Sequence, residues 1–188
     1  MLRALFTVGL GTTLLLSSSA VQSQGAKPGP VSTAPVVILE TDHGVLEIET
    51  FPEDAPKSVA HFVALVKKGF YRGQRFHWVQ PGLVQAGDPY SRDITQQKKW
   101  GTGGSGPNKA NKPIGVAEFS KRKFDRGIVA LAYRPTWKTE TADSMFFIVL
   151  APSPHLTGKY TILGRVTKGM TVADKIEMNE VIRNMTVK

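Results

Sequence analysis

Four histidines are the side chains of this sequence best suited to proton transfer or metal binding at neutral pH. They are His43, His61, His77 and His155, and they are widely separated along the chain. Their scatter matches no zinc-binding pattern, and no Ser-His-Asp grouping accompanies them. The chain has no cysteine, which excludes thiol catalysis, thiolate metal sites and disulfides. We therefore expect no metal site.

A glycine-rich run is the other feature that could carry chemistry. Residues 101–107 read Gly-Thr-Gly-Gly-Ser-Gly-Pro, within a stretch from Asp88 to Phe119 that is poor in apolar periodicity. A phosphate-binding P-loop needs Gly-Lys followed by Ser or Thr and a helix behind it, and neither is present. Nucleotide binding is therefore not expected, and a loop this long is typical of a functional or mobile segment.

The charge of the chain is strongly positive. The 188 residues include 24 Lys and Arg against 15 Asp and Glu, a formal net charge of +9. Such a balance favours acidic partners or a membrane surface. The basic residues are scattered, however, and no nucleic-acid-binding motif accompanies them, so we expect no nucleic-acid partner.

The first 20 residues have the features of a secretion signal. Arg3 gives a positive start, an apolar run covers 4–16, and Ser-Ser-Ala at 18–20 offers a cleavage site. The run is short for a membrane span, so no stable membrane insertion is expected after cleavage, although an uncut N-terminal anchor is an alternative. Residues 21–35 read as a flexible linker. Residues 36–188 then form one domain, periplasmic or secreted.

The elements of this domain are mostly short strands. Runs at 36–41 and 45–50 predict an antiparallel hairpin around His43. Further strands are predicted at 75–79, 83–86, 128–132, 145–149, 160–166 and 181–187. Eight strands without a βαβ rhythm favour an antiparallel barrel.

Two helices are predicted to cap this barrel. Val59, Phe62, Val63 and Val66 form an apolar stripe in a helix that begins near Pro56 and ends before the glycine at 69. His61 falls on the opposite, solvated face. A second helix over 172–178 is predicted from a capping box formed by the residues at 171 and 174.

Several collinear motifs give the chain a resemblance to a known family. They read Phe-His-Trp-Val-Gln-Pro-Gly-Leu-Val-Gln-Ala-Gly-Asp-Pro at 76–89, Gly-Thr-Gly-Gly at 101–104, Asp-Ser-Met-Phe-Phe-Ile at 143–148 and His-Leu-Thr-Gly-Lys-Tyr-Thr-Ile-Leu-Gly-Arg-Val at 155–166. Pro52, Ala55, Pro56, Ser58, Val59 and Phe62 add a fifth match. In this order the motifs resemble the cyclophilins, peptidyl-prolyl cis-trans isomerases. The resemblance covers about 36–188 and implies a mainly β fold, an eight-stranded antiparallel closed barrel capped by two α-helices.

The reaction that this resemblance implies needs no nucleophile, metal or cofactor. Rotation about an X–Pro bond has a barrier of about 18–20 kcal/mol, because amide resonance is lost. An enzyme lowers it by gripping the proline ring in an apolar pocket and offering polar groups that fit the twisted amide better than the planar one. The expected partners are proline-containing unfolded or extended polypeptides.

The resemblance also implies site residues. The proline pocket would be floored by Phe147 and bordered by Leu83, Val84, Met145, Leu156 and Tyr160. Gln85 and the main chain near Ala132 and Tyr133 would contact the substrate backbone, as His155 could. Phe76 and His77 match the opening pair of the motif and are also expected to contact the substrate. Core packing is the alternative for Phe147, since only one of the adjacent residues 146 and 147 can face the pocket.

Trp78 is the main departure from the family pattern. The family has an arginine here, thought to stabilise the twisted amide, whereas tryptophan offers one N–H and no charge. The loss of one such donor commonly costs about 10²–10³-fold in rate, so Trp78 predicts a weak isomerase. Arg134 is a candidate substitute, and a solvated loop arginine is its other interpretation. Met145 and His155 also depart from the usual residues, so we expect weak binding of cyclosporin-type ligands.

The sequence thus supports two hypotheses. One is an exported monomeric peptidyl-prolyl isomerase of reduced activity that assists slow folding steps. The other is a non-catalytic, chaperone-like module that binds peptides in the same groove, where Trp78 and Met145 would enlarge an adaptable apolar surface.

Overall fold

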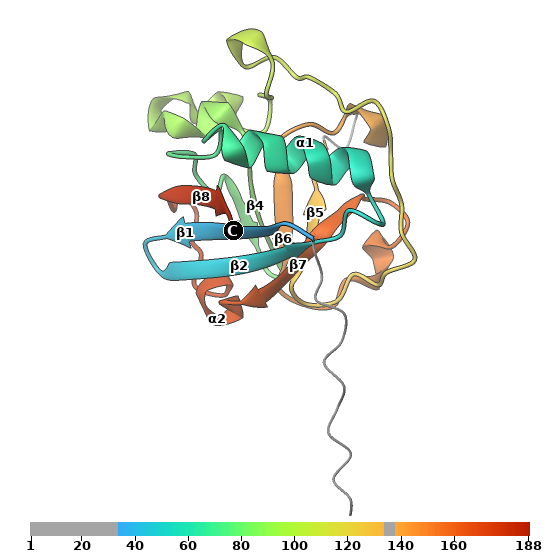
Figure 1. The fold of residues 1–188 in the computed structure, drawn as a ribbon. Coiled ribbons are helices and arrows are strands. Elements are labelled where there is room, and N and C mark those ends of the chain that lie inside the picture. Colours follow the sequence, from blue (N-terminus) through green and yellow to red (C-terminus); the bar gives the residue numbers. More distant parts are fainter. Residues whose placement is uncertain (1–33, 134–137) are drawn as a thin grey trace, which may run out of the picture. The chain divides into compact units, whose positions relative to one another are not determined.

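Eight antiparallel strands form a single curled sheet in the computed structural model, which describes residues 34–133 and 138–188 (Figure 1). Their order across the sheet is β3-β4-β6-β5-β7-β2-β1-β8. The strands are β1 Val36–Thr41, β2 Gly44–Thr50, β3 Trp78–Gln80, β4 Leu83–Ala86, β5 Ile128–Leu131, β6 Phe146–Val149, β7 Ile162–Lys168 and β8 Asn184–Val187. The predicted eight-stranded antiparallel architecture is confirmed, although β3 and β8 begin three residues later than predicted.

The two edge strands, β3 and β8, are joined through the segments that precede them. An antiparallel bridge links Arg75 to Val181. Backbone bonds from Gly73 to Ile182 (2.9 Å) and from Phe76 to the carbonyl of Glu180 (2.9 Å) extend this contact. These contacts bring the two ends of the curled sheet together.

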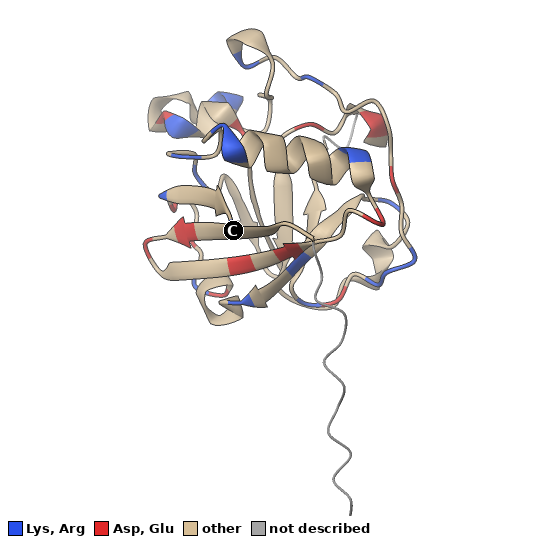
Figure 2. Ribbon diagram, in the orientation of Figure 1, with Lys and Arg blue, Asp and Glu red and all other residues tan. Residues whose placement is uncertain are grey.

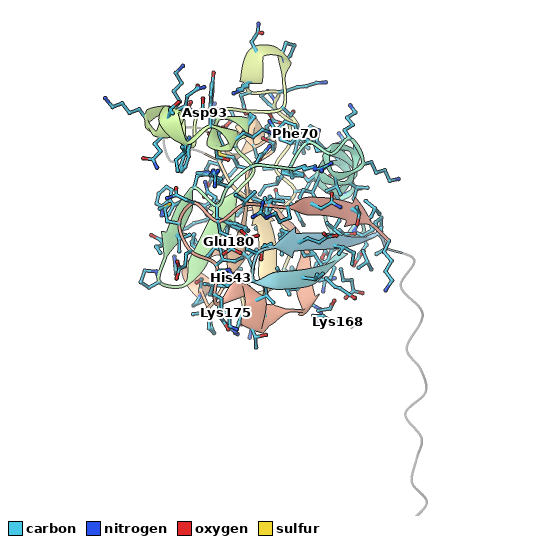
Figure 3. The ribbon with its side chains drawn as sticks, turned by 90° about the vertical axis from the view of Figure 1, so that its left-hand side faces the viewer. His43, Phe70, Asp93, Lys168, Lys175 and Glu180 are labelled. Atoms are coloured by element: carbon cyan, nitrogen blue, oxygen red, sulfur yellow. The ribbon has the colours of Figure 1, made fainter. Side chains whose placement is uncertain are left out.

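A contact between two side chains reinforces this closure. His43 Nδ1, in the turn between β1 and β2, lies 2.8 Å from a carboxylate oxygen of Glu180, and the side chain of Glu180 is almost fully buried (Figure 3). The first hairpin is thereby tied to the segment that leads into β8.

Helix α1 (Pro56–Lys67) covers one face of the sheet (Figure 1). Pro56 occupies the first turn, where its missing N–H costs nothing. The predicted stripe is buried: Val59, Phe62 and Val66 join the same core cluster as residues of β1, β2 and β6. Val63 is also buried, so the helical spacing of these residues is confirmed.

The second helix differs from its prediction. Helix α2 covers only Met170–Ala173, and its N-cap is Gly169 without any side-chain cap. The predicted capping box is therefore wrong. Gly169 has φ of +88°, and a Cβ there would lie 2.3 Å from the carbonyl oxygen of Val45, so glycine is required by backbone packing. Asp174 instead pairs with Arg126 at 2.6 Å.

The sheet has a hydrophobic cluster on each of its faces. The larger cluster lies with α1 and includes Phe146, Val84 and Phe76, all with no exposed surface. The second cluster contains Phe147, Met145 and neighbours from β5 and β7 on the opposite face. Strand alternation separates Phe146 from Phe147 in this way.

The charged side chains lie around these clusters. Figure 2 shows Lys and Arg spread over helical turns, loops and strands. None of the helices in the described part of the chain has the length and apolar character needed to cross a bilayer.

Candidate active site

A cavity of about 360 Å³ lies over the second hydrophobic cluster. Three of its side chains follow one another across the sheet, because Trp78 on β3 is the register partner of Gln85 on β4, and Gln85 is the partner of Phe147 on β6. Register partners project from the same face of a sheet. The described residues that line the cavity are His77, Trp78, Gln80, Leu83, Gln85, Trp100, Gly101, Ala132, Tyr133, Met145, Phe147, His155, Leu156 and Tyr160.

Phe147 forms the apolar base of this cavity. Its ring lies 6.2 Å from that of Phe124 in a stacked arrangement and 5.2 Å from that of Tyr160 in an edge-to-face arrangement. Tyr160 also packs against Tyr133 at 4.8 Å. Only 3% of Phe147 is exposed, and it still lines the cavity. Its neighbours therefore fix the orientation of the ring at the base of the cavity.

Gln85 supplies an amide side chain to the cavity. Its amide nitrogen lies 3.2 Å from His77 Nε2 and 3.9 Å from the sulfur of Met145. Burial lowers the pKa of His77 below its usual value, and the charge of Asp88 offsets this only in part. A neutral His77 can accept the amide hydrogen of Gln85, which orients this side chain.

Trp78 stands at the rim of the cavity, with 46% of its surface exposed. Its indole N–H donates to Gln80 Oε1 over 3.3 Å. This bond uses the only donor of the side chain, so Trp78 offers apolar ring surface to a ligand.

Trp100 is a cavity residue that sequence reasoning missed. Its indole N–H donates to the carbonyl oxygens of Tyr90 (3.1 Å) and Asp93 (3.2 Å). The only sequence signal for it is its position directly before the motif Gly-Thr-Gly-Gly at 101–104, which follows the 3₁₀ turn η2 (Ile94–Lys99).

The buried carboxylate of Asp88 holds the glycine-rich run in place by accepting hydrogen bonds from its backbone N–H groups. Asp88 accepts from the N–H groups of Tyr90 (2.7 Å), Thr102 (2.8 Å) and Gly103 (3.2 Å). A Cβ at Gly103 would lie 2.4 Å from this carboxylate. This close approach explains why residue 103 is a glycine. The same bonds position the nearby Gly101 in the cavity wall.

A second carboxylate, Asp143, anchors the same loop. It accepts from the N–H of Ser105 (2.7 Å), the hydroxyl of Ser105 (2.6 Å) and the N–H of Lys112 (2.8 Å), and it lies 2.9 Å from His61 Nε2. Desolvation by burial raises the pKa of Asp143, but the hydrogen bonds from His61, Ser105 and Lys112 outweigh it and leave the pKa below its ordinary value. His61 is thus a partner of Asp143, and its predicted solvated position is wrong.

Most of the predicted site residues are brought together. Trp78, Gln85, His77 and the residues Leu83, Ala132, Tyr133, Met145, Phe147, His155, Leu156 and Tyr160 all line the cavity. Phe76 and Val84 do not, because both are fully buried in the cluster beneath α1, and their predicted substrate contacts are corrected accordingly. Arg134 lies outside the described residues. Within the described ranges no group of three His, Asp or Glu side chains could hold a metal ion.

The chain is similar to a large set of prolyl isomerases. The family model "Cyclophilin type peptidyl-prolyl cis-trans isomerase/CLD" matches residues 36–188. A probable peptidyl-prolyl cis-trans isomerase of Brucella abortus is 39% identical over 92% of this chain and 85% of its own length. Peptidyl-prolyl cis-trans isomerase B of Bacillus subtilis is 35% identical over 80% of this chain and 95% of its own.

Solved structures show the same relationship. A cyclophilin-type isomerase of Cryptosporidium parvum superposes with a TM-score of 0.66 at 27% identity, covering 82% of this chain and 97% of its own. That protein was also crystallised in the presence of the dipeptide Ala-Pro. Because the family model spans the whole folded part and the relatives agree with it, the chain belongs to the cyclophilin-type peptidyl-prolyl cis-trans isomerase family.

Proposed function

We propose that this chain isomerises X–Pro bonds of unfolded or extended polypeptides in the cavity over Phe147, at a reduced rate because Trp78 supplies no charge there. The observation that carries the proposal is the row Trp78-Gln85-Phe147, which places an apolar base and one amide side by side under an exposed indole.

The mechanism follows from what the cavity can bind. The proline ring would lie on Phe147, enclosed by Met145, Leu156 and Tyr160. With the ring held, the preceding carbonyl rotates, and no covalent bond is made or broken. Rotation removes amide resonance and its charge separation, so an apolar cavity favours the twisted amide over the planar one. The Gln85 amide, oriented by His77, can hydrogen-bond the substrate backbone.

The expected reduction in rate rests on the uncharged character of the described lining residues. No Lys, Arg, Asp or Glu is among the described residues that line the cavity. A preorganised cationic donor at the prolyl nitrogen would stabilise its developing lone pair. Removal of one such donor costs about 10²–10³-fold in other enzymes, and we expect a deficit of this order.

The test compares the wild-type protein with Trp78→Arg and Gln85→Ala. Two-dimensional NMR exchange spectroscopy on a short Ala-Pro peptide would measure the cis-trans rate. We expect a modest acceleration over buffer, a gain of about tenfold or more in Trp78→Arg, and a loss in Gln85→Ala. If neither the wild type nor Trp78→Arg exceeds the buffer rate, the catalytic proposal is wrong.

A non-catalytic, chaperone-like role is the second candidate, and the neutral aromatic rim at Trp78 and Trp100 favours it. The same spectra separate the two roles, because line broadening reports binding while exchange peaks report isomerisation. Binding without enhanced exchange, in the wild type and in Trp78→Arg alike, would assign the chain to this second role.

We also propose that residues 1–20 direct export to the periplasm or the medium and that the mature chain is a monomer. The apolar run at 4–16 and the sequence Ser-Ser-Ala at 18–20 support the export proposal. N-terminal sequencing of the exported protein should begin at Val21, and light scattering should give the mass of one chain. A full-length protein retained in the membrane fraction would indicate an uncut anchor instead.

A further inference from the structure

Two indole rings border the cavity, and neither has a free hydrogen-bond donor. The N–H of Trp78 is bound to Gln80, and that of Trp100 is shared by two backbone carbonyls. Both rings line the cavity. What these side chains present to a ligand is therefore polarisable, apolar ring surface.

The register of the sheet sets how far this surface lies from the proline position. Trp78 and Phe147 are separated by one strand, β4, in the row through Gln85. Two strand spacings amount to about 10 Å between their backbones. An extended peptide advances about 3.3 Å per residue, and an aromatic side chain adds several ångströms. A proline ring on Phe147 thus leaves the side chain of an adjacent residue within reach of Trp78.

The charges of the lining restrict which side chain this can be. The described lining residues include no Lys, Arg, Asp or Glu that could pair with a charged neighbour of the proline. His77 is buried, and burial lowers its pKa, so it stays neutral near pH 7. A carboxylate placed against the indoles would lose hydration without gaining a cationic partner among the described lining residues. A cationic side chain would recover part of this cost through a cation–π contact, and an aromatic one would gain stacking without losing the hydration of a charge.

We propose that Trp78 makes the site selective for proline segments that carry an aromatic residue next to the proline, and that acidic neighbours are disfavoured. This inference rests on the proposed function, since it assumes that the cavity over Phe147 receives the proline. Aromatic pairing is worth about twofold to tenfold in affinity beyond the area buried, and we expect a preference of that size over a leucine neighbour.

The test uses four peptides of one length with Phe, Leu, Glu or Lys before the proline, and the same four residues after it. NMR titration gives the Kd of each peptide, and exchange spectroscopy gives its isomerisation rate, at about 0.3 M salt so that the net positive charge is screened. The Phe peptide of at least one series should bind best. Trp78→Ala should remove the advantage of Phe over Leu, and Trp78→Phe should keep part of it.

Phe119→Ala is the matched control. Phe119 is an aromatic residue as exposed as Trp78, at 48%, and it does not line the cavity. This variant should leave the ranking of peptides unchanged, and circular dichroism should show all variants folded.

Equal affinities for all neighbours, with isomerisation still accelerated, would overturn the selectivity and leave the proposed function standing. Absence of any binding or acceleration would overturn the proposed function itself, and selective binding without acceleration would support the selectivity in a binding module.

Discussion

Phe146 and Phe147 are adjacent residues of the same type with different surroundings. Phe146 packs with Phe62 and Tyr71 beneath α1, whereas Phe147 lies against Phe124 and Tyr160 at the base of the cavity. A truncation at either position removes similar apolar volume. Only the truncation at 147 also changes the surface that a proline ring would contact, so the two positions separate stability from function.

We expect Phe147→Leu to lower kcat/KM by about tenfold or more, because a flat ring surface at the base of the cavity is lost. Phe146→Leu should instead destabilise the fold by about 1–2 kcal/mol with near-normal kcat/KM. Urea denaturation and the peptide exchange assay measure the two effects. If Phe146→Leu lost as much activity per folded molecule as Phe147→Leu, the assignment of the two faces would be incorrect.

Which of two neighbouring residues faces the site was only partly predictable from the sequence. Alternation shows that Phe146 and Phe147 point to opposite faces, and the resemblance selects Phe147. For Leu83 and Val84 the same reasoning included both, and the structure keeps only Leu83 in the cavity. Phe76 lies just before β3 and is fully buried. Because it falls outside the strand, the alternation of residues along the strand could not predict which face it occupies.

At the scale of the elements, the N-terminus of α1 has an unusual cap. Its N-cap residue, Ala55, has no side chain able to accept a hydrogen bond. The carboxylate of Glu118, from the long loop, instead accepts from the N–H of Lys57 (3.1 Å) and of Ser58 (2.8 Å). A negative charge there also matches the positive end of the helix dipole.

Glu118→Ala should therefore cost about 0.5–2 kcal/mol of unfolding free energy, the usual range for a lost cap. Glu118→Gln should lose less, because its amide oxygen can still accept one of the two bonds. Urea melts give both values, and Glu140→Ala, at an exposed position of η4 (Thr139–Thr141), serves as the control. Equal losses in Glu118→Ala and Glu140→Ala would show that Glu118 does not cap the helix.

Local patterns predicted α1 well and α2 poorly. The apolar stripe of α1 repeats over three turns, so its burial is encoded within the helix itself. Its cap comes from a residue about 60 positions away, which local patterns cannot reveal. For α2, the four residues Met170–Ala173 are too few for a period, and Gly169 is dictated by contact with β2.

At the scale of the whole domain, three carboxylates hold the long segment between β4 and β5. Asp88 binds its glycine-rich part, Asp143 binds Ser105 and Lys112, and Glu118 joins its later part to α1. This segment was predicted only as functional or mobile. Each of these bonds joins residues distant in sequence, so the motif residues were visible in the sequence while the hydrogen bonds that pair them were not.

Glycines of this segment occur where its backbone approaches these carboxylates closely. A Cβ at Gly104 would lie 2.5 Å from the carboxylate of Asp143 and 2.5 Å from Asn111 Cα. Gly104→Ala should therefore push the loop away from Asp143 and cost about 1–3 kcal/mol, as expected for overpacking. Thermal unfolding measures the loss. A variant as stable as the wild type would show that the loop can shift without cost.

The dependence of stability on pH tests this arrangement most directly. The pKa of Asp143 is below its ordinary value in the folded state, so its ionised form stabilises the fold at pH values above the unfolded pKa of about 4. This contribution is lost as the pH falls through the folded pKa. Asp143→Asn should cost about 1–3 kcal/mol at pH 7, and the difference from wild type should shrink as the pH falls below about 4 and through the folded pKa.

Urea denaturation of both proteins at several pH values measures this difference, with Asp125→Asn at an exposed position as the control. The lowered pKa of His77 also makes stability fall as the pH drops below about 6.5, because only the unfolded ring then takes up a proton. That slope is common to the wild type and to Asp143→Asn, so it cancels in their difference. A difference that stayed constant from pH 7 to pH 2 would mean that Asp143 acts through packing rather than through its charge.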